Sequence, residues 1–235
     1  MSFFSGLFNR SCPLNLEGFV DWHCHILPGV DDGVRSMNES LEMLDVYEMA
    51  GIKEVWLTPH VMEDVPNTTA MLRARFQDLE KAYSGKVRLH LASENMMDNL
   101  LLERLETGDV LPIGNDGRTL LVETSYFNAP IKLNQTIETI KSKGYFPLLA
   151  HPERYDYIDS ISSYRKLREQ GVQFQLNLMS LCGYYGPAVK DKAQKLLSEG
   201  MYECIGSDCH RKEHIEIICD MKLSRSIMER LADLT

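Results

Sequence analysis

Seven short apolar runs recur along the chain, and segments with helical periodicity separate them. The runs are apolar nearly throughout instead of alternating with polar residues, which is typical of parallel strands that are covered on both faces. They lie at residues 19–24, 54–58, 87–92, 119–123, 145–150, 172–177 and 202–206. The pattern therefore predicts a buried parallel sheet.

Helical segments fill most of the gaps between these runs, at residues 40–50, 69–83, 131–143, 162–170 and 188–199. Four of them are followed by a glycine, the residue favoured just past a helix C-terminus, namely Gly51, Gly144, Gly171 and Gly200. A strand comes soon afterwards in each case. Strand, helix, glycine and strand in repetition are typical of βαβ units.

Seven such units in a chain of 235 residues favour a single α/β barrel over an open doubly wound sheet. We expect one domain over residues 1–235, in which residues 1–17 form an N-terminal tail. The apolar side chains between residues 3 and 8 are too few for a signal peptide. We favour a frayed or packed tail over contact with a membrane surface. The chain lacks G-x-G-x-x-G and G-x-x-x-x-G-K-[ST] after its first strand, so no nucleotide-binding fold is indicated.

The composition is that of a globular protein in a reducing compartment. The net charge of -9 argues against nucleic-acid binding, which usually requires a basic surface. It leaves an anionic substrate open, because bound metal ions can reverse the local field. The six cysteines include no Cys-x-x-Cys pair and are interpreted as thiols. No apolar run reaches the length of a transmembrane helix, and we expect a cytoplasmic protein.

Five of the seven histidines lie at or just past the carboxyl end of a predicted strand, where α/β barrels build their active sites. They are His23, His25, His60, His151 and His210. Because His23 and His25 are two residues apart, both would point to the same face of a strand. An isolated histidine would more often be structural, but the set as a whole indicates a metal site.

Carboxylates occupy further strand ends, at Glu94, Glu123 and Asp208, and Asp31 and Asp32 follow the first strand. Imidazole and carboxylate together bind ions such as Zn, Mn and Fe. The nine favoured ligands are His23, His25, Asp32, His60, Glu94, Glu123, His151, Asp208 and His210. This set is too large for one tetrahedral ion, so we expect two or three divalent ions: Mn, Fe, Zn or Mg. Neighbouring ions can activate a shared water and clamp a phosphoryl group.

Several other reactive residues are interpreted as structural. His90 lies in the middle of the third run, and His214 lies in a charged segment that we expect to be a solvated loop. Cys24 and Cys209 stand between ligand candidates and should point to the opposite strand face. Residues 219–225 match the Cys-x5-Arg spacing of cysteine phosphatases, but they lack the glycines of a phosphate-cradling loop and are expected to be helical.

The order of these residues resembles that of the PHP (polymerase and histidinol phosphatase) superfamily. Within it, the chain is similar to the bacterial capsule- and exopolysaccharide-locus protein-tyrosine phosphatases. The matching stretches are Asp21-Trp22-His23-Cys24-His25-Ile26-Leu27-Pro28-Gly29-Val30-Asp31-Asp32-Gly33, Thr58-Pro59-His60, Ala92-Ser93-Glu94-Asn95, Leu121-Val122-Glu123, Ala150-His151-Pro152-Glu153-Arg154 and Ser207-Asp208-Cys209-His210. They extend over nearly the whole chain.

The resemblance implies a (β/α)7 fold, a distorted TIM-like barrel of the PHP type. It also implies up to three metal ions, often Mn, Fe or Zn. By analogy, the first ion would be held by His23, His25, Glu94 and Asp208, the second by Glu94, Glu123 and His151, and the third by Asp32, His60 and His210.

Arg154 matches the phosphate-binding arginine of the family. Its planar guanidinium suits phosphate oxygens, and the alternative role is a surface salt bridge with a neighbouring carboxylate. Asp208 and His210 complete the catalytic set that the resemblance implies. Some relatives carry a second arginine after the final Asp-x-His motif. Here Arg211 and Lys212 follow in a different local pattern, so that role stays open.

The resemblance further implies hydrolysis of phosphotyrosine in a protein, most simply the tail of a membrane-bound tyrosine kinase that controls polysaccharide export. A metal-bridging hydroxide would attack phosphorus in line, and His210 or a metal-bound water would protonate the phenolate. A small-molecule phosphatase such as histidinol phosphatase stays open as the alternative. So does an amidohydrolase, although Glu123 replaces the carboxylated lysine that those enzymes often carry, and so does a catalytically inactive metal-binding scaffold protein. The oligomeric state also stays open.

Overall fold

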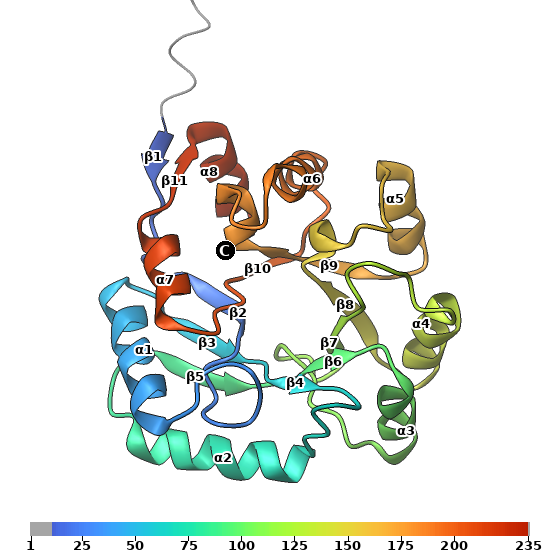
Figure 1. The fold of residues 1–235 in the computed structure, drawn as a ribbon, viewed down its shortest axis with the longest axis horizontal. Coiled ribbons are helices and arrows are strands. Elements are labelled where there is room, and N and C mark those ends of the chain that lie inside the picture. The colour runs from blue at the N-terminus through green and yellow to red at the C-terminus, as the bar shows by residue number, and fades with distance from the viewer. Residues whose placement is uncertain (1–10, 235) are drawn as a thin grey trace, which may run out of the picture.

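The computed structural model describes residues 11–234, in which strands and helices alternate (Figure 1). The strands are β1 (Ser11–Pro13), β2 (Val20–Cys24), β3 (Glu54–Leu57), β4 (His60–Val61), β5 (Arg88–Leu91), β6 (Glu94–Met96), β7 (Thr119–Glu123), β8 (Phe146–Ala150), β9 (Gln173–Asn177), β10 (Cys204–Gly206) and β11 (Lys222–Ser224). The helices are α1 (Met37–Met49), α2 (Thr69–Ala82), α3 (Asn99–Thr107), α4 (Leu133–Ser142), α5 (Ile161–Glu169), α6 (Pro187–Ser198), α7 (Lys212–Cys219) and α8 (Arg225–Ala232). Two 3₁₀ segments, η1 (Pro152–Arg154) and η2 (Leu178–Cys182), follow β8 and β9.

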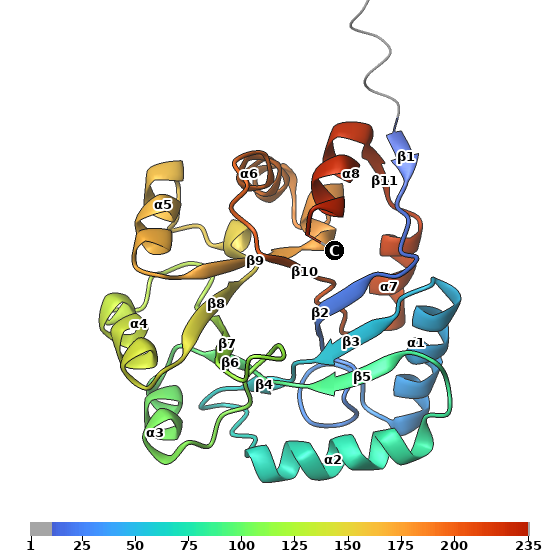
Figure 2. The ribbon, with the colours of Figure 1, turned by 180° about the vertical axis from the view of Figure 1, so that it is seen from behind.

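Two parallel sheets occupy the centre of the molecule. One has the order β2-β3-β5, and the other has the order β10-β9-β8-β7-β6-β4. After β3 and after β5 the chain breaks its strand and resumes in the other sheet, as β4 and β6. Figures 1 and 2 show the helices around the outside of the strands. The result is an α/β fold with a curled, half-barrel sheet.

All seven predicted runs contain a strand, namely β2, β3, β5, β7, β8, β9 and β10. The five predicted helices correspond to α1, α2, α4, α5 and α6. Helices α3, α7 and α8 go beyond the five that were predicted. Helix α3 has 9 residues, between an N-cap at Asp98 and a left-handed C-cap at Gly108. None of the helices in residues 11–234 is long and apolar enough to cross a bilayer.

Two expectations near the C-terminal end of the chain are corrected. Residues 220–224 are not helical, because β11 lies there and pairs antiparallel with β1. His214 is not in a solvated loop: it lies in α7 and is buried. In the expected N-terminal tail, the described residues are packed onto the fold, since β1 pairs with β11 and Leu16 is buried. The expectation for residues 3–8 lies outside the described residues.

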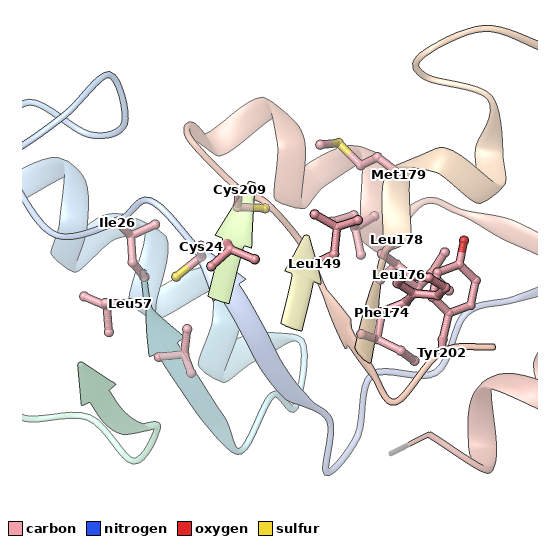
Figure 3. Close-up of a cluster of buried hydrophobic side chains, with 14 of the residues drawn as sticks. Cys24, Ile26, Leu57, Leu149, Phe174, Leu176, Leu178, Met179, Tyr202 and Cys209 are labelled. Carbon is pink, nitrogen blue, oxygen red and sulfur yellow. The ribbon is translucent and has the colours of Figure 1, made fainter. Parts of the chain in front are cut away.

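The main hydrophobic core lies between the strands and the surrounding helices. Figure 3 shows part of it, with Leu57 from β3 and Phe174 from β9. Cys24 and Cys209 are fully buried in the same core, as Figure 3 also shows. Their side chains therefore leave the strand face that carries the neighbouring histidines, as the alternation along a strand predicts.

A smaller apolar cluster lies on the other face of the same strands. Its buried members are Trp56, Ala92, Ile113, Leu121, Leu148, Ala150 and Cys204. Trp22 packs against it and stacks on Trp56, with 5.6 Å between ring centroids and an interplanar angle of 6°. Because both faces of the strands are covered by apolar side chains, the sequence runs are apolar without interruption.

Strands β2 and β10 lie side by side at the point where the two sheets meet. The N–H of Asp208 donates to the carbonyl of His23 at 2.8 Å, and the N–H of His25 donates to the carbonyl of Cys209 at 2.8 Å. These two bonds bring the His-x-His motif of β2 next to the Asp-x-His motif that follows β10. Residues nearly two hundred positions apart in the sequence are thus held in one register.

A buried carboxylate, that of Asp21, stabilises the contact between β2 and β10. Asp21 is fully buried and accepts hydrogen bonds from Ser207 N at 2.7 Å, Ser207 Oγ at 2.5 Å and Tyr47 OH at 2.8 Å. Burial raises the pKa of Asp21 above its ordinary value, in spite of the hydrogen bonds from Ser207 and Tyr47. The hydrogen bonds supply what water would otherwise give this carboxylate, and they tie β2, α1 and β10 together.

We predict that Gly206→Ala separates β2 from β10. A Cβ at Gly206 would lie 2.4 Å from the Cβ of His23, and overpacking of this kind costs about 1–3 kcal/mol of unfolding free energy. Urea denaturation measures this loss, and because His23 is displaced, the affinity for divalent metal should fall as well.

Gly144→Ala is the control for this variant, because nothing lies within 4 Å of its added Cβ. Because Gly144 has φ of 87°, alanine at this position should cost about 1 kcal/mol in backbone strain. It should have no effect on the contact between β2 and β10. If Gly206→Ala kept the metal affinity of Gly144→Ala, the proposed role of this close approach would be wrong.

Candidate metal centre

The nine predicted ligands converge at one end of the strands. Three groups have ligand atoms within 4.8 Å of one another: His25 with Asp32, His60 and His210; His23 with His25 and Glu94; and His60 with Glu94 and Glu123. Asp208 and His151 complete the cluster. Asp208 Oδ1 lies 3.6 Å from His23 Nε2, and His151 Nε2 lies 3.1 Å from Glu94 Oε1. The fold therefore brings all nine side chains together from seven different strand ends and loops.

Glu94 lies at the centre of this cluster and is fully buried. Its Oε2 atom lies 3.2 Å from His23 Nε2, 3.3 Å from His25 Nε2 and 3.2 Å from His60 Nδ1. Burial raises the pKa of Glu94, but His23, His60 and His151 together hold it well below its usual range. A carboxylate whose two oxygens face different imidazoles is suited to bridge two ions.

Hydrogen bonds fix the orientation of three imidazole rings. His23 Nδ1 lies 2.7 Å from Gln175 Oε1, and His25 Nδ1 lies 2.8 Å from Asp31 Oδ2. His210 Nδ1 lies 2.8 Å from the carbonyl oxygen of Asp208. Each partner is an acceptor, so Nδ1 carries the proton and the lone pair on Nε2 points into the cluster. This arrangement is usual for metal-bound histidine.

The Nε2 atoms of His23 and His25 face one another at 3.0 Å. With both protons on Nδ1, neither nitrogen can donate to the other, so two lone pairs point at the same space. Protonating one ring would satisfy the contact, and so would a cation between them. Burial lowers the pKa of each ring, but the surrounding carboxylates outweigh it and raise both pKa values above the ordinary value, so negative charge is in excess here and a cation could balance it.

Several buried polar atoms of the cluster have no hydrogen-bond partner. Among residues 11–234, His60 Nδ1, Glu94 Oε2, Glu123 Oε1 and His151 Nδ1 belong to this group. Burial lowers the pKa of His60, but the facing Glu94 and Glu123 raise it to about 9, which reflects a surplus of negative charge. Divalent ions would coordinate unpaired nitrogen and oxygen atoms of this kind and would balance the charge of the carboxylates beside them. The residues therefore fit metal binding.

Two of these residues have a backbone conformation that side chains rarely adopt. His151 has φ of 35° and Asp208 has φ of 54°, and no other non-glycine residue among 11–234 has a positive φ. Such strain is commonly retained at functional sites because it aims a side chain. Both residues follow the end of a strand, and both point their side chains at the cluster.

Arg154 borders the cluster and is held on three sides. Its Nη1 donates to Asp208 Oδ2 at 2.8 Å, and its guanidinium lies between the rings of Tyr126, at 4.4 Å, and Tyr185, at 4.1 Å. Burial lowers the pKa of Arg154, but Asp208 raises it above the ordinary value, so the charge is permanent. Of the two roles predicted for Arg154, the surface salt bridge is therefore wrong. Its carboxylate partner is Asp208 inside the site.

A cavity of about 670 Å³ opens over the cluster and Arg154. Its polar floor contains Asp32, His60, Glu94, Glu123, His151, Asp208 and His210. Its walls carry thioether and aromatic side chains, namely Met62, Met96, Tyr126, Phe127, Tyr184 and Tyr185. Arg211 also lines this cavity, and its Nη2 donates to Tyr184 OH at 3.1 Å. The site thus combines a floor of metal-type ligands, bordered by a guanidinium, with apolar walls.

Supporting residues behind the cluster were only partly visible in the sequence. Asp31 follows the first strand and was noted there, but its contact with His25 depends on a turn in which Gly33 N donates to Asp31 Oδ1 at 3.0 Å. Gln175 and Asn177 are absent from the prediction, because an amide in a strand gives no signal of metal chemistry. His90 stays outside the site, as expected: it stacks on Trp56 at 4.6 Å between ring centroids.

Comparisons with known proteins identify a matching family and several relatives of the chain. The family described as "Capsular polysaccharide synthesis, CpsB/CapC" matches residues 19–232. The chain is 30% identical over 196 residues to the tyrosine-protein phosphatase YwqE of Bacillus subtilis (strain 168), covering 81% of this chain and 77% of that one. It is 26% identical over 201 residues to the tyrosine-protein phosphatase CpsB of Streptococcus pneumoniae, covering 81% and 82%.

The chain has a fold similar to that of a solved structure of a tyrosine phosphatase. That structure comes from work on "YwqE from Bacillus subtilis and CpsB from Streptococcus pneumoniae, unique metal-dependent tyrosine phosphatases". Its TM-score is 0.77 with 26% sequence identity, over 92% of this chain and 85% of that chain. The likeness extends over the curled sheet and the helices around it.

We predict that removal of divalent metal lowers the thermal stability of the protein. Without cations the buried carboxylates repel one another, and a ligand present at a hundred times its Kd contributes about 2.7 kcal/mol. For a chain of this size the unfolding midpoint should fall by roughly 5–10 °C in EDTA, measured by calorimetry, and it should recover when Mn is added back.

Two variants check the location of the effect. Glu94→Gln removes the central carboxylate and should lose most of the response to metal, whereas His90→Gln, on a strand outside the cluster, should keep it. An equal response in both variants would place the metal elsewhere in the chain.

Proposed function

This chain belongs to the CpsB/CapC family of capsular polysaccharide synthesis, and from that premise we propose that it is a metal-dependent protein-tyrosine phosphatase, a phosphoric monoester hydrolase. The observation that carries the proposal is the position of Arg154, a permanent cation held by Asp208 at the edge of a cluster of metal-type ligands. A phosphate ester is the substrate that uses both features. The names of the two phosphatase relatives support the same activity.

The proposed site holds two or three divalent ions, with Mn first and Fe, Zn or Mg as alternatives. When bound, such ions lower the pKa of coordinated water and neutralise charge on the phosphoryl group. The proposed ligand sets are His23, His25, Glu94 and Asp208 for one ion, Glu94, Glu123 and His151 for a second, and Asp32, His60 and His210 for a third. Short distances within each set support its membership. The sets also adjoin one another, because His60 Nδ1 lies 3.2 Å from Glu94 Oε2 and 3.1 Å from Glu123 Oε1.

Three residues are proposed to act on the phosphate ester directly or to position it. Arg154 binds the phosphoryl oxygens, for which its guanidinium offers several parallel N–H donors. Asp208 keeps that guanidinium at the edge of the cluster through their 2.8 Å contact. His210 borders the open cavity and is the proposed proton donor to the leaving oxygen in the state in which its Nε2 carries a proton and holds no metal ion. Phenolate is a good leaving group, so this contribution is modest.

The walls of the cavity favour an aryl phosphate over histidinol phosphate. Tyr126, Tyr185 and Met96 offer apolar surface to a phenyl ring above the cluster. An amine such as that of histidinol would instead need a carboxylate on the wall. Among the described residues that line the cavity, the carboxylates all belong to the metal-type cluster. A small-molecule amino phosphate is therefore the weaker candidate.

The setting of the enzyme forms part of the proposal. We propose one hydrolase domain over residues 1–235. We also propose that its strands form a distorted (β/α)7 barrel, and the parallel β-bridge between Cys24 and Cys209, which joins the two sheets, supports this. We propose a cytoplasmic location and, as the partner, the phosphorylated tail of a membrane-bound tyrosine kinase. The family's link to capsular polysaccharide synthesis supports this partner.

The proposal predicts a specific pattern of phosphate release. The protein should hydrolyse a phosphotyrosine peptide at least about tenfold faster, in kcat/KM, than histidinol phosphate, because only the aryl group gains contact with the walls. EDTA should abolish the activity and Mn should restore it, whereas a thiol alkylator should leave it intact. Activity that resists EDTA and is lost on alkylation would exclude the metal mechanism, and a preference for histidinol phosphate would exclude the tyrosine-phosphatase assignment.

A second prediction concerns Arg154. Arg154→Lys keeps the charge but removes the planar fork and the stacking on both tyrosines, so kcat/KM for the phosphotyrosine peptide should fall by about 10²-fold. The inhibition constant of inorganic phosphate should rise at the same time. Arg165→Lys, whose side chain is paired on the surface with Glu199, is the matched control and should change neither quantity. Wild-type phosphate inhibition in Arg154→Lys would exclude this residue from the phosphate site.

A further inference from the structure

The loop that follows β7 places an exposed aromatic side chain at the edge of the cavity. Phe127 lines the cavity, yet 72% of its surface is exposed. A large apolar side chain in water gains free energy when a second apolar surface covers it. Position and exposure together indicate that Phe127 is covered when the site is in use.

The base of this loop is firmly anchored, so the position of Phe127 is defined by the fold. Thr124 N donates to Tyr155 OH at 3.2 Å, and Thr124 Oγ1 lies 2.6 Å from Tyr157 OH. Asp156 N donates to the carbonyl of Tyr126 at 2.8 Å. Tyr126 itself packs on Arg154 and on Tyr155. The residue before Phe127 is thus tied to the phosphate-binding arginine.

A second aromatic residue, Tyr184, lies on the wall of the same cavity and comes from the segment after β9. It is 41% exposed, meets Tyr185 edge to face at 5.0 Å, and accepts a hydrogen bond from Arg211. The cavity therefore has partly exposed aromatic side chains contributed by two separate loops. A phenyl phosphate with its phosphorus at the floor points its para substituent away from the floor, toward the open side of the cavity.

We infer that Phe127 binds the side chain next to the phosphotyrosine in a polypeptide substrate, and that this makes the enzyme prefer an apolar neighbour. The inference rests on the proposed function and narrows its substrate class. Continuity decides the occupant: Phe127 is part of the wall of the cavity that takes the phosphotyrosine, so the chain attached to that residue passes over it. An anionic bilayer fits less well, since the chain carries a net charge of -9.

The test uses peptides that differ only beside the phosphotyrosine. One peptide has leucine on both sides of it, and the other has serine. Wild-type enzyme should favour the leucine peptide about tenfold in kcat/KM, because an apolar contact of this size is worth that factor. Phe127→Ser should reduce the preference to less than about threefold, within the same protein preparation. Because the readout is a ratio of two substrates, a general loss of activity or of folded protein does not change it.

Ile131→Ser is the matched control. Ile131 belongs to the same loop and is fully exposed, but it does not line the cavity. This variant should keep the tenfold preference of the wild type. An equal loss in Ile131→Ser would mean that the loop, not the wall position of Phe127, sets the selectivity, and the inference would be wrong.

Other outcomes separate this inference from the proposed function. Equal rates on both peptides with wild-type enzyme would overturn the inference alone. Failure to release phosphate from any phosphotyrosine peptide would overturn the proposed function, and the inference with it. Binding of wild-type protein to vesicles of anionic lipid that Phe127→Ser abolishes, with peptide preference unchanged, would assign the exposed ring to a membrane and would also overturn the inference.

Discussion

The site depends on the contact between β2 and β10, and that contact depends on one buried carboxylate. Asp21 accepts from the backbone and side chain of Ser207, so the end of β10 cannot slide along β2 without leaving a buried charge unpaired. Losing such a partner is far more costly than a surface hydrogen bond. The register that results brings His23 beside Asp208. Gly206 contributes because its missing Cβ lets the two strands approach.

A second constraint is the charge of the cluster. Glu94, Glu123 and Asp208 are buried together, with Arg154 as a permanent cation in direct contact with Asp208. Burial lowers the pKa of His60, but Glu94 and Glu123 raise it to about 9. Protonation of the histidine rings could also balance this charge. Because Nδ1 of His23 and Nδ1 of His25 are bonded to Gln175 and Asp31, the added protons would occupy the Nε2 atoms. The hydrogen bonds at Nδ1 thus leave the Nε2 lone pairs of His23 and His25 facing the cluster, where a cation can bind.

The strands and the candidate ligands could both be predicted from the sequence, because each depends on a short local pattern of residues. Apolar runs ending in histidine or carboxylate need no knowledge of distant contacts. Asp21 and Gln175 were not assigned roles, because their value comes from partners more than a hundred residues away. The segment at β11 was expected to be helical for a related reason, since its strand exists through pairing with β1. Local pattern identifies the donors, and tertiary contact decides how they are held.

Asp208 joins the two halves of the site, and its geometry explains why one residue can do so. Its Oδ2 accepts from Arg154 at 2.8 Å and from Asn177 at 2.9 Å, which leaves Oδ1 to face His23 and His25. The positive φ of Asp208 turns the side chain so that each oxygen meets its own partners. The guanidinium and the metal-type ligands are therefore aligned by a single carboxylate. If Arg154 binds the phosphoryl group as proposed, this alignment would hold that group at a fixed place relative to the cluster. Fixed placement of this kind is a large part of what accelerates phosphoryl transfer.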